Sequence, residues 1–263
     1  MHHAFKVLIT MTKHFLLSLL LLSISMAAAS TNWKAKWISS PYSQSQTNTW
    51  LGFRKQINID LVPEKAIANI AVDSKYWLWI NNELVVFEGG LKRGPNPKDT
   101  YYDEVNINPY LRKGSNVINI VLWYFGKQGF SHNSSGKAGL LFDCQTPQFD
   151  ILSDHTWKSM MLNAFGTCGN PLPNFRLSES SILYNSDKSL NGFNITGYPD
   201  SRFHNAYVIG LYGDAPWNEC HHRTIPLFRF SELKSFESVH ISGKHSDFDT
   251  VFCKLPRNFK LFI

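Results

Sequence analysis

The sequence predicts an all-β fold, an antiparallel β-sandwich of jelly-roll type. Three observations support this prediction. Short segments of alternating apolar and polar residues recur along the chain, and clusters of Pro, Gly, Asn and Ser separate them. Helical periodicity is nearly absent from the same region. One of the segments is apolar on both of its faces, which is typical of a strand inside a layered structure.

That segment is the stretch DSKYWLWINNELVVFEGG, residues 73–90. Alternation directs Trp77 and Trp79 to one face of a strand, and directs three apolar side chains to the other: Tyr76, Leu78 and Ile80. Asn81 and Asn82 follow, and both can adopt the positive φ angles of a tight hairpin turn. The apolar run after them is the expected return strand. The sequence leaves open whether the aromatic side chains only fill a core or also contact a ligand.

The other expected strands precede and follow this hairpin. They cover residues 50–59, 66–72, 100–107 and 116–125. Gly114 is expected to form the turn before the last of them, and Asp103 is expected to accept backbone hydrogen bonds that hold the preceding loop. Two long irregular stretches, residues 89–103 and 126–139, connect these strands. Loops of this length inside a compact domain are often functional.

The first thirty residues are expected to be a signal peptide. Lys13 and His14 precede an apolar run that ends in Ala27-Ala28-Ala29, an A-x-A cleavage pattern. The run is shorter than a membrane-spanning helix needs, so export to the periplasm or the exterior is favoured over an anchor. Met11 is an alternative start to Met1. Removal of the signal takes Lys6 and Lys13 and no acidic residue, so the net charge falls from +6 to +4, and no basic run predicts nucleic-acid binding.

Six segments carry a family resemblance. In chain order they are WKAKWI, FRKQINI, AIANIAVDSKYWLWINNELV, YYDEVNINPYLRKGSNVINIVLWYFGKQGFSH, SDHTWK and PWNECHHRTIP. Together they resemble the amino-terminal β-sandwich, of galactose-binding-like fold, of bacterial α-L-rhamnosidase-like glycoside hydrolases. The resemblance implies a sandwich over residues 31–228 and an irregular tail over residues 229–263. The (α/α)₆ catalytic barrel of these enzymes has no counterpart here. We therefore expect a truncated member of the family, and we favour the hypothesis that this chain alone is not an enzyme.

Carbohydrate binding is the function that this resemblance and the loop composition favour. Aromatic faces pack on the C–H patches of a sugar ring, while amide, guanidinium and imidazole groups bind its hydroxyls. The predicted binding residues lie in the two long loops and at the adjoining strand ends: Arg93, Asn96, Tyr101, Tyr102, Trp123, Phe130, His132 and Asn133. The expected binding partner is a plant or microbial glycan, with rhamnose-containing glycans among the candidates.

Two alternatives stay open at the level of sequence. The first is a structural fragment without a ligand, whose tryptophans are core and whose loops dock on a missing catalytic domain. The second is a hydrolase of rhamnose-containing glycans with an unfamiliar site, which would need two facing carboxyl groups. The carboxylates available for such a site are Glu88, Asp99, Asp103, Glu104 and Asp143.

No cofactor or transition metal is expected. Cys220, His221 and His222 are adjacent, but neighbouring residues of a strand point to opposite faces and do not easily share one ion. A structural Ca²⁺ held by backbone oxygens stays open. The spacing of Cys144, Cys168, Cys220 and Cys253 matches no metal or redox motif, and it leaves both disulfides and free thiols open.

Overall fold

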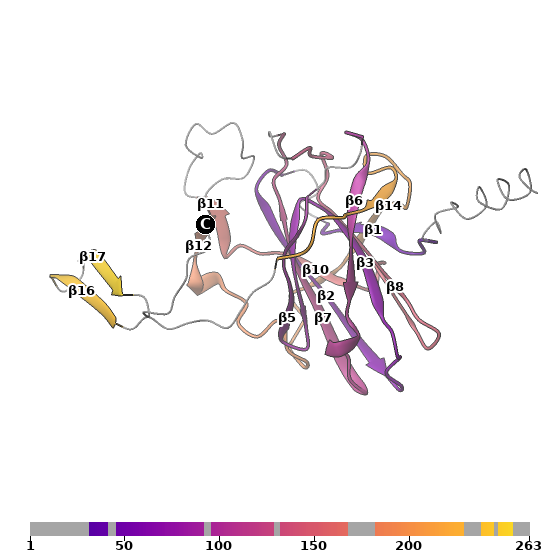
Figure 1. The fold of residues 1–263 in the computed structure, drawn as a ribbon, viewed down its shortest axis with the longest axis horizontal. Helices are drawn as coiled ribbons and strands as arrows, with labels where there is room; N and C mark the ends of the chain where they lie inside the picture. The colour runs from indigo at the N-terminus through magenta and orange to yellow at the C-terminus, as the bar shows by residue number, and fades with distance from the viewer. Residues whose placement is uncertain are drawn as a thin grey trace, which may run out of the picture.

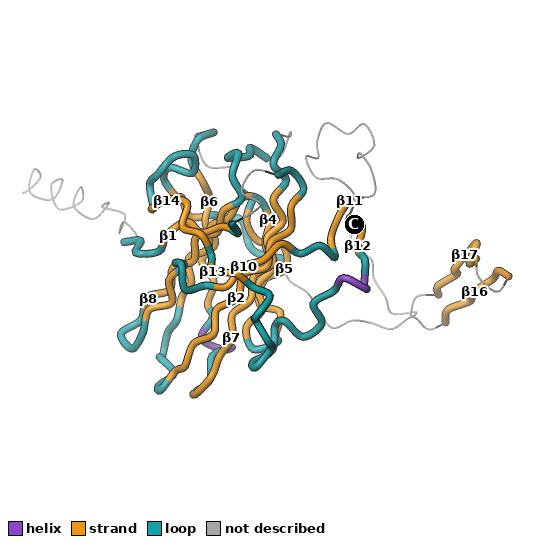
Figure 2. Tube along the Cα trace, turned by 180° about the vertical axis from the view of Figure 1, so that it is seen from behind, coloured by secondary structure: helices purple, strands orange, loops and turns teal. Residues whose placement is uncertain are grey.

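The structure is a computed structural model. It describes residues 32–41, 46–91, 96–128, 132–167, 182–228, 238–244 and 247–254. The predicted signal peptide lies outside these residues. Within them, no helix has the length and apolar character needed to cross a bilayer. Nearly all regular structure is β-strand, arranged as two large sheets that lie together, with long loops at their ends (Figures 1 and 2).

One large sheet has six strands in the order β13-β10-β2-β7-β4-β5. Their bounds are His204–Asn205, Lys158–Met161, Thr49–Ile59, Gly114–Tyr124, Lys75–Ile80 and Glu83–Gly90. The centre of this sheet is the antiparallel pair β2 and β7, which are eleven residues long and paired along their whole length. Figure 2 shows β10, β2 and β7 side by side.

The other large sheet has seven strands, six of them in the order β14-β1-β8-β3-β6-β15, with β9 pairing with β8. Their bounds are Tyr207–Leu211, Lys36–Ser39, Gly139–Gln145, Ile67–Asp73, Thr100–Asn106 and Cys220–His222, and β9 is Asp150–Leu152. β15 pairs with β6 in parallel, whereas the sequence predicted antiparallel pairing throughout. The reason is topological: the chain crosses over after β14 and enters the edge of the sheet beside the start of β6.

Smaller elements complete the described structure. β11 (Phe165–Thr167) and β12 (Ile182–Tyr184) form a two-stranded ribbon beside the sandwich (Figures 1 and 2). Two short 3-10 helices are present, η1 (Asn108–Tyr110) and η2 (Ser186–Lys188). In the tail that the sequence predicted to be irregular, β16 (Ser238–Lys244) and β17 (Asp247–Lys254) pair as an antiparallel hairpin.

The main hydrophobic core lies between the two large sheets, which confirms the predicted sandwich. Tyr76, Leu78 and Ile80 of β4 are fully buried in it. They meet buried side chains from the facing sheet, such as Ile70 and Phe142. The strict alternation of β4 thus gives one face entirely to this core and leaves the tryptophan face for the outside of the sheet.

The turns that the sequence predicted are confirmed. Asn81 and Asn82 have φ angles of 51° and 73°, and they connect Ile80 to Glu83 as a two-residue hairpin. Gly114 has a φ of 90°. Asp103 accepts a 2.8 Å hydrogen bond from the backbone N–H of Gly90, which lies at the start of the loop that Asp103 was expected to hold.

A second apolar layer covers the outer face of each large sheet. On the seven-stranded sheet, Trp37 of β1 stacks on Trp217 with ring centroids 4.3 Å apart, and both are fully buried. On the six-stranded sheet, Trp50 lies among Trp77, Trp123 and Phe165. The outer faces are therefore packed, and the segments after residue 160 supply much of the cover.

Candidate functional site

The two long loops start from neighbouring strands at one end of the sandwich, as the sequence argument for a binding site requires. At this end β3 and β7 finish and β4 and β8 begin: Asp73 is opposite Gly139, and Lys75 is opposite both Gly90 and Trp123. Residues 89–103 and 126–139 thus leave neighbouring strand ends. We call this region the loop end.

Two of the predicted sugar-binding residues are in the interior, which corrects the expectation that they reach a ligand at the surface. Trp123 is 3% exposed and stacks on Trp50 with centroids 4.5 Å apart. His132 is fully buried and packs edge-on against Phe125. The physical reason is the outer apolar layer, which covers the end of β7 where the sequence suggested an open strand end.

The remaining predicted residues have varied surroundings. Asn96 is exposed, and its side chain accepts a hydrogen bond from the backbone N–H of Lys98. Tyr101, Tyr102 and Asn133 are half-buried, and Tyr102 packs edge-on against Trp33 at 5.2 Å. Arg93 and Phe130 lie outside the described residues. A binding role for the accessible members of the set stays a prediction.

A buried polar cluster at the loop end was not anticipated from the sequence. The Ser74 hydroxyl lies 3.0 Å from His132 Nε2 and 2.9 Å from Asp73 Oδ1, and Asp73 also accepts from the backbone N–H of Ser135. Asp73 Oδ1 is 3.2 Å from the same His132 Nε2. A Ser-His-Asp triad has its carboxylate on Nδ1, but His132 Nδ1 has no partner among the described residues. Because all three side chains are buried, we interpret the cluster as a structural connection between the β3–β4 junction and the loop that follows β7.

The carboxylates considered for hydrolysis are mostly held by structural partners. Glu88 lies 3.3 Å from Lys75, and Asp99 lies 3.1 Å from His221. Asp103 binds the Arg223 guanidinium in addition to Gly90. Asp143 accepts from the backbone N–H groups of Lys34 and Ala35, and Glu104 is exposed on the outer face of β6. These contacts account for the four buried or half-buried carboxylates without catalysis.

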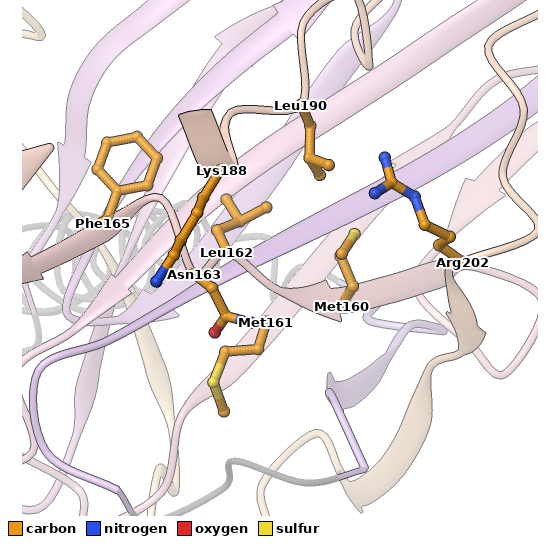
Figure 3. Close-up of a pocket in the computed structure, with 8 residues that line it drawn as sticks. All are labelled: Met160, Met161, Leu162, Asn163, Phe165, Lys188, Leu190 and Arg202. Atoms are coloured by element: carbon orange, nitrogen blue, oxygen red, sulfur yellow. The ribbon is translucent and has the colours of Figure 1, made fainter. Parts of the chain in front are cut away.

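A pocket of about 490 Å³ opens beside β10, at a place the sequence analysis did not single out. Its lining residues come from the segment around β10 and from the chain after β12: Met160, Met161, Leu162, Asn163, Phe165, Lys188, Leu190 and Arg202. Figure 3 shows Met160 and Leu162 between the side chains of Lys188 and Arg202. The pocket is therefore lined by five apolar side chains, which we call its floor, and by Asn163, Lys188 and Arg202, which we call its rim. We call it the β10 pocket.

The β10 pocket is built on the outer aromatic layer. Leu162 donates its backbone N–H to the carbonyl of Trp50 over 2.8 Å, which fixes the end of β10 to β2. Phe165 stacks on the Trp50 ring at 4.4 Å. On the other side, the backbone N–H of Asn185 donates to Ala164, and the Asn185 side chain caps η2, which carries Lys188. Both walls of the pocket are thus anchored by backbone hydrogen bonds.

Cys144 and Cys220 are free thiols, and their pKa values predict low reactivity. Burial and the nearby Asp143 raise the pKa of Cys144 to about 12, and burial and Asp99 raise the pKa of Cys220 to about 12. Both thiols are therefore protonated at pH 8, and the thiolate is the nucleophile. We expect iodoacetamide at pH 8 to leave both unlabelled in the folded chain and to label both in urea, as read by peptide mapping. Equal labelling rates would contradict this.

The same shift links these thiols to stability. Because their pKa values are raised on folding, the thiols lose their protons at a lower pH in the unfolded chain than in the folded chain. The stability that depends on the neutral thiols is therefore present below about pH 9 and is lost progressively toward pH 12.

Solved α-L-rhamnosidases share this fold. The chain superposes on a GH78 family rhamnosidase of Bacillus sp. GL1 with a TM-score of 0.66 and 25% identity, over 74% of this chain and 20% of that one. This chain resembles one part of a rhamnosidase. The α-L-rhamnosidase of Dictyoglomus thermophilum gives a TM-score of 0.58 and 20% identity, over 80% and 24% of the two chains. That of Aspergillus terreus gives 0.53 and 17%, over 71% and 22%.

The match covers only part of each rhamnosidase, so it does not extend to the activity of the whole enzyme. The chain spans about a fifth to a quarter of the length of these rhamnosidases. The two structures at 20% and 17% identity show a similarity of fold alone. No family model matches the sequence, and no curated protein does. The chain is therefore a β-sandwich module of the kind found within rhamnosidases.

Proposed function

We propose that this chain is a non-catalytic module that binds carbohydrate and is accessory to glycoside hydrolysis, with a rhamnose-containing glycan as its ligand. The observation that carries the proposal is the β10 pocket. It combines an apolar floor with side chains that can bind hydroxyl groups at its rim, which is the combination that a sugar ring needs. The similarity to rhamnosidases supports a glycan as the ligand. Export, as the first thirty residues suggest, would bring the module to such glycans.

The pocket also favours binding over hydrolysis. Hydrolysis of a glycosidic bond needs two carboxyl groups facing each other across the bond. Of the residues that the structure describes, no Asp or Glu lines the β10 pocket. A second depression of about 460 Å³, on the outer face of the seven-stranded sheet, includes Asp143 as its one carboxylate, and that residue is held by Lys34 and Ala35.

A structural role at a domain boundary is the second candidate. Large apolar side chains are exposed near β12 and beyond β15: Ile182, Leu183, Tyr184, Ile225 and Phe228. An exposed apolar patch is typical of a surface that contacts another domain. The two roles are compatible, because none of these exposed residues lines the β10 pocket. Tyr184 contacts Phe165, which does line it.

Substitution at the β10 pocket tests the binding proposal. We expect Asn163→Ala to weaken binding of a rhamnose-containing oligosaccharide about two- to tenfold, because the lost amide supplies a hydrogen bond worth about 1 kcal/mol. Asn163 is exposed, so the fold should be unaffected. Isothermal titration calorimetry measures the change.

A matched control uses an amide away from the pocket. Asn96→Ala removes an exposed amide at the loop end. If Asn96→Ala weakens binding and Asn163→Ala does not, the binding site is at the loop end. If neither the chain nor its variants binds any glycan, the proposal is wrong and the structural role gains weight.

A further inference from the structure

The charged groups of the β10 pocket have one sign. Lys188 and Arg202 line it, and no carboxylate among the described residues does. In Figure 3 they stand on either side of Met160 and Leu162. Two cations therefore flank the apolar side chains of the pocket.

Neither cation is neutralised by a neighbouring acid among the described residues. No ion pair joins Lys188 or Arg202 to a carboxylate there. The nearest acids in the sequence are Asp187 and Asp200, and Asp200 lies 3.9 Å from the guanidinium of Arg54 instead. Arg202 uses one N–H group, over 3.2 Å, to donate to the Tyr198 hydroxyl. Within the part of the chain that the structure describes, its other donors make no hydrogen bond and can bind a ligand.

The side chains of the rim can donate more hydrogen bonds than they can accept. Lysine and arginine side chains donate hydrogen bonds and accept none. The Asn163 side chain contributes a single carbonyl acceptor. A neutral sugar offers hydroxyl groups that both donate and accept, whereas a carboxylate or sulfate offers acceptors only. The rim therefore matches a ligand rich in acceptors, and arginine binds a carboxylate with two parallel hydrogen bonds.

We infer that the β10 pocket selects anionic glycans, in which a uronate or a similar acidic group lies between Lys188 and Arg202. The inference rests on the proposed carbohydrate-binding function and adds the chemical class of the ligand. The apolar floor would contact the ring, and the two cations would hold its acidic group. The net positive charge of the chain favours the approach of such a polymer.

The test compares two probes that differ only at C6 of each sugar, where a carboxylate is replaced by a neutral hydroxymethyl group. One is a tetrasaccharide of galacturonate, and the other is the same tetrasaccharide after reduction of its carboxyl groups to CH₂OH. We expect the folded chain to bind the acidic probe more tightly. This preference should shrink when the salt rises from about 0.1 M to about 1 M, because the Debye length falls from about 10 Å to about 3 Å.

Two variants assign the preference to the pocket. Lys188→Gln and Arg202→Gln should each weaken binding of the acidic probe about two- to fivefold, the range expected for exposed ion pairs. They should weaken binding of the reduced probe less, because the glutamine amide still forms hydrogen bonds with hydroxyl groups. Both residues are exposed, so neither substitution should disturb the fold. Lys113→Gln is the control, because it removes the same charge beside Gly114, at the opposite end of β7 from the loop end.

The outcomes separate this inference from the function on which it rests. Tighter, salt-sensitive binding of the acidic probe that Lys188→Gln and Arg202→Gln weaken supports the inference. Equal binding of the two probes overturns it but leaves the carbohydrate-binding function standing. An equal loss in Lys113→Gln also overturns it, because the preference would then come from overall charge. Binding of neither probe, nor of a rhamnose-containing oligosaccharide, overturns both.

Discussion

Trp217→Ala is expected to cost about 3–5 kcal/mol of the free energy of unfolding, the usual range for a buried tryptophan. Trp217 is fully buried and stacks on Trp37 at 4.3 Å. The fit is close, since a side chain on Gly139 would come within 2.6 Å of the Trp217 ring. Truncation would leave a cavity over the outer face of the seven-stranded sheet. Urea unfolding followed by circular dichroism measures the loss.

The matched control is an aromatic residue on the same sheet that lacks this packing. Tyr207 of β14 is 57% exposed, so Tyr207→Ala should cost less than about 0.5 kcal/mol. An equally small cost for Trp217→Ala would contradict the role of Trp217 in the apolar layer that covers the outer face of the seven-stranded sheet.

Asp73→Ala is expected to destabilise the fold by about 3 kcal/mol. The substitution removes the acceptor for Ser74 and for the backbone N–H of Ser135, and it leaves buried polar groups without partners. His132 would lose the carboxylate that lies 3.2 Å away and would keep the Ser74 hydroxyl. Urea unfolding measures the change. Asp60→Ala, on an exposed turn, should change stability by less than about 0.5 kcal/mol.

A second variant distinguishes the loss of hydrogen bonds from the loss of side-chain volume in the same cluster. Asp73→Asn keeps the shape and one acceptor, so it should cost less than Asp73→Ala. If Asp73→Ala and Asp60→Ala cost the same, the buried cluster does not tie the loops together, and the loop end is held by other contacts.

Local sequence signals were sufficient for the central hairpin. The alternation of β4 predicts which of its faces meets the core, and two asparagines predict the positive φ angles of its turn. The role of Asp103 could be predicted for a related reason: a buried carboxylate beside a loop is satisfied by the backbone amides nearest to it. These features depend on residues that are close together in the chain.

The β10 pocket could not be predicted in this way. Its walls combine residues 160–165 with Lys188, Leu190 and Arg202, which come from the far side of a gap of more than twenty residues. The burial of His132 and Trp123 also depends on distant partners, Ser74 and Trp50. Loop composition predicts where polar and aromatic residues occur, but the tertiary packing decides which of them remain accessible.

The most direct test of the binding proposal is to map the contact surface of a glycan on the folded chain. Amide chemical shifts of the ¹⁵N-labelled chain are recorded while a rhamnose-containing acidic oligosaccharide is added. The account predicts that the largest shifts fall on residues 160–165 and 188–202, around the β10 pocket. Shifts confined to residues 96–102 and 126–133 at the loop end, or no shifts at all, would contradict it.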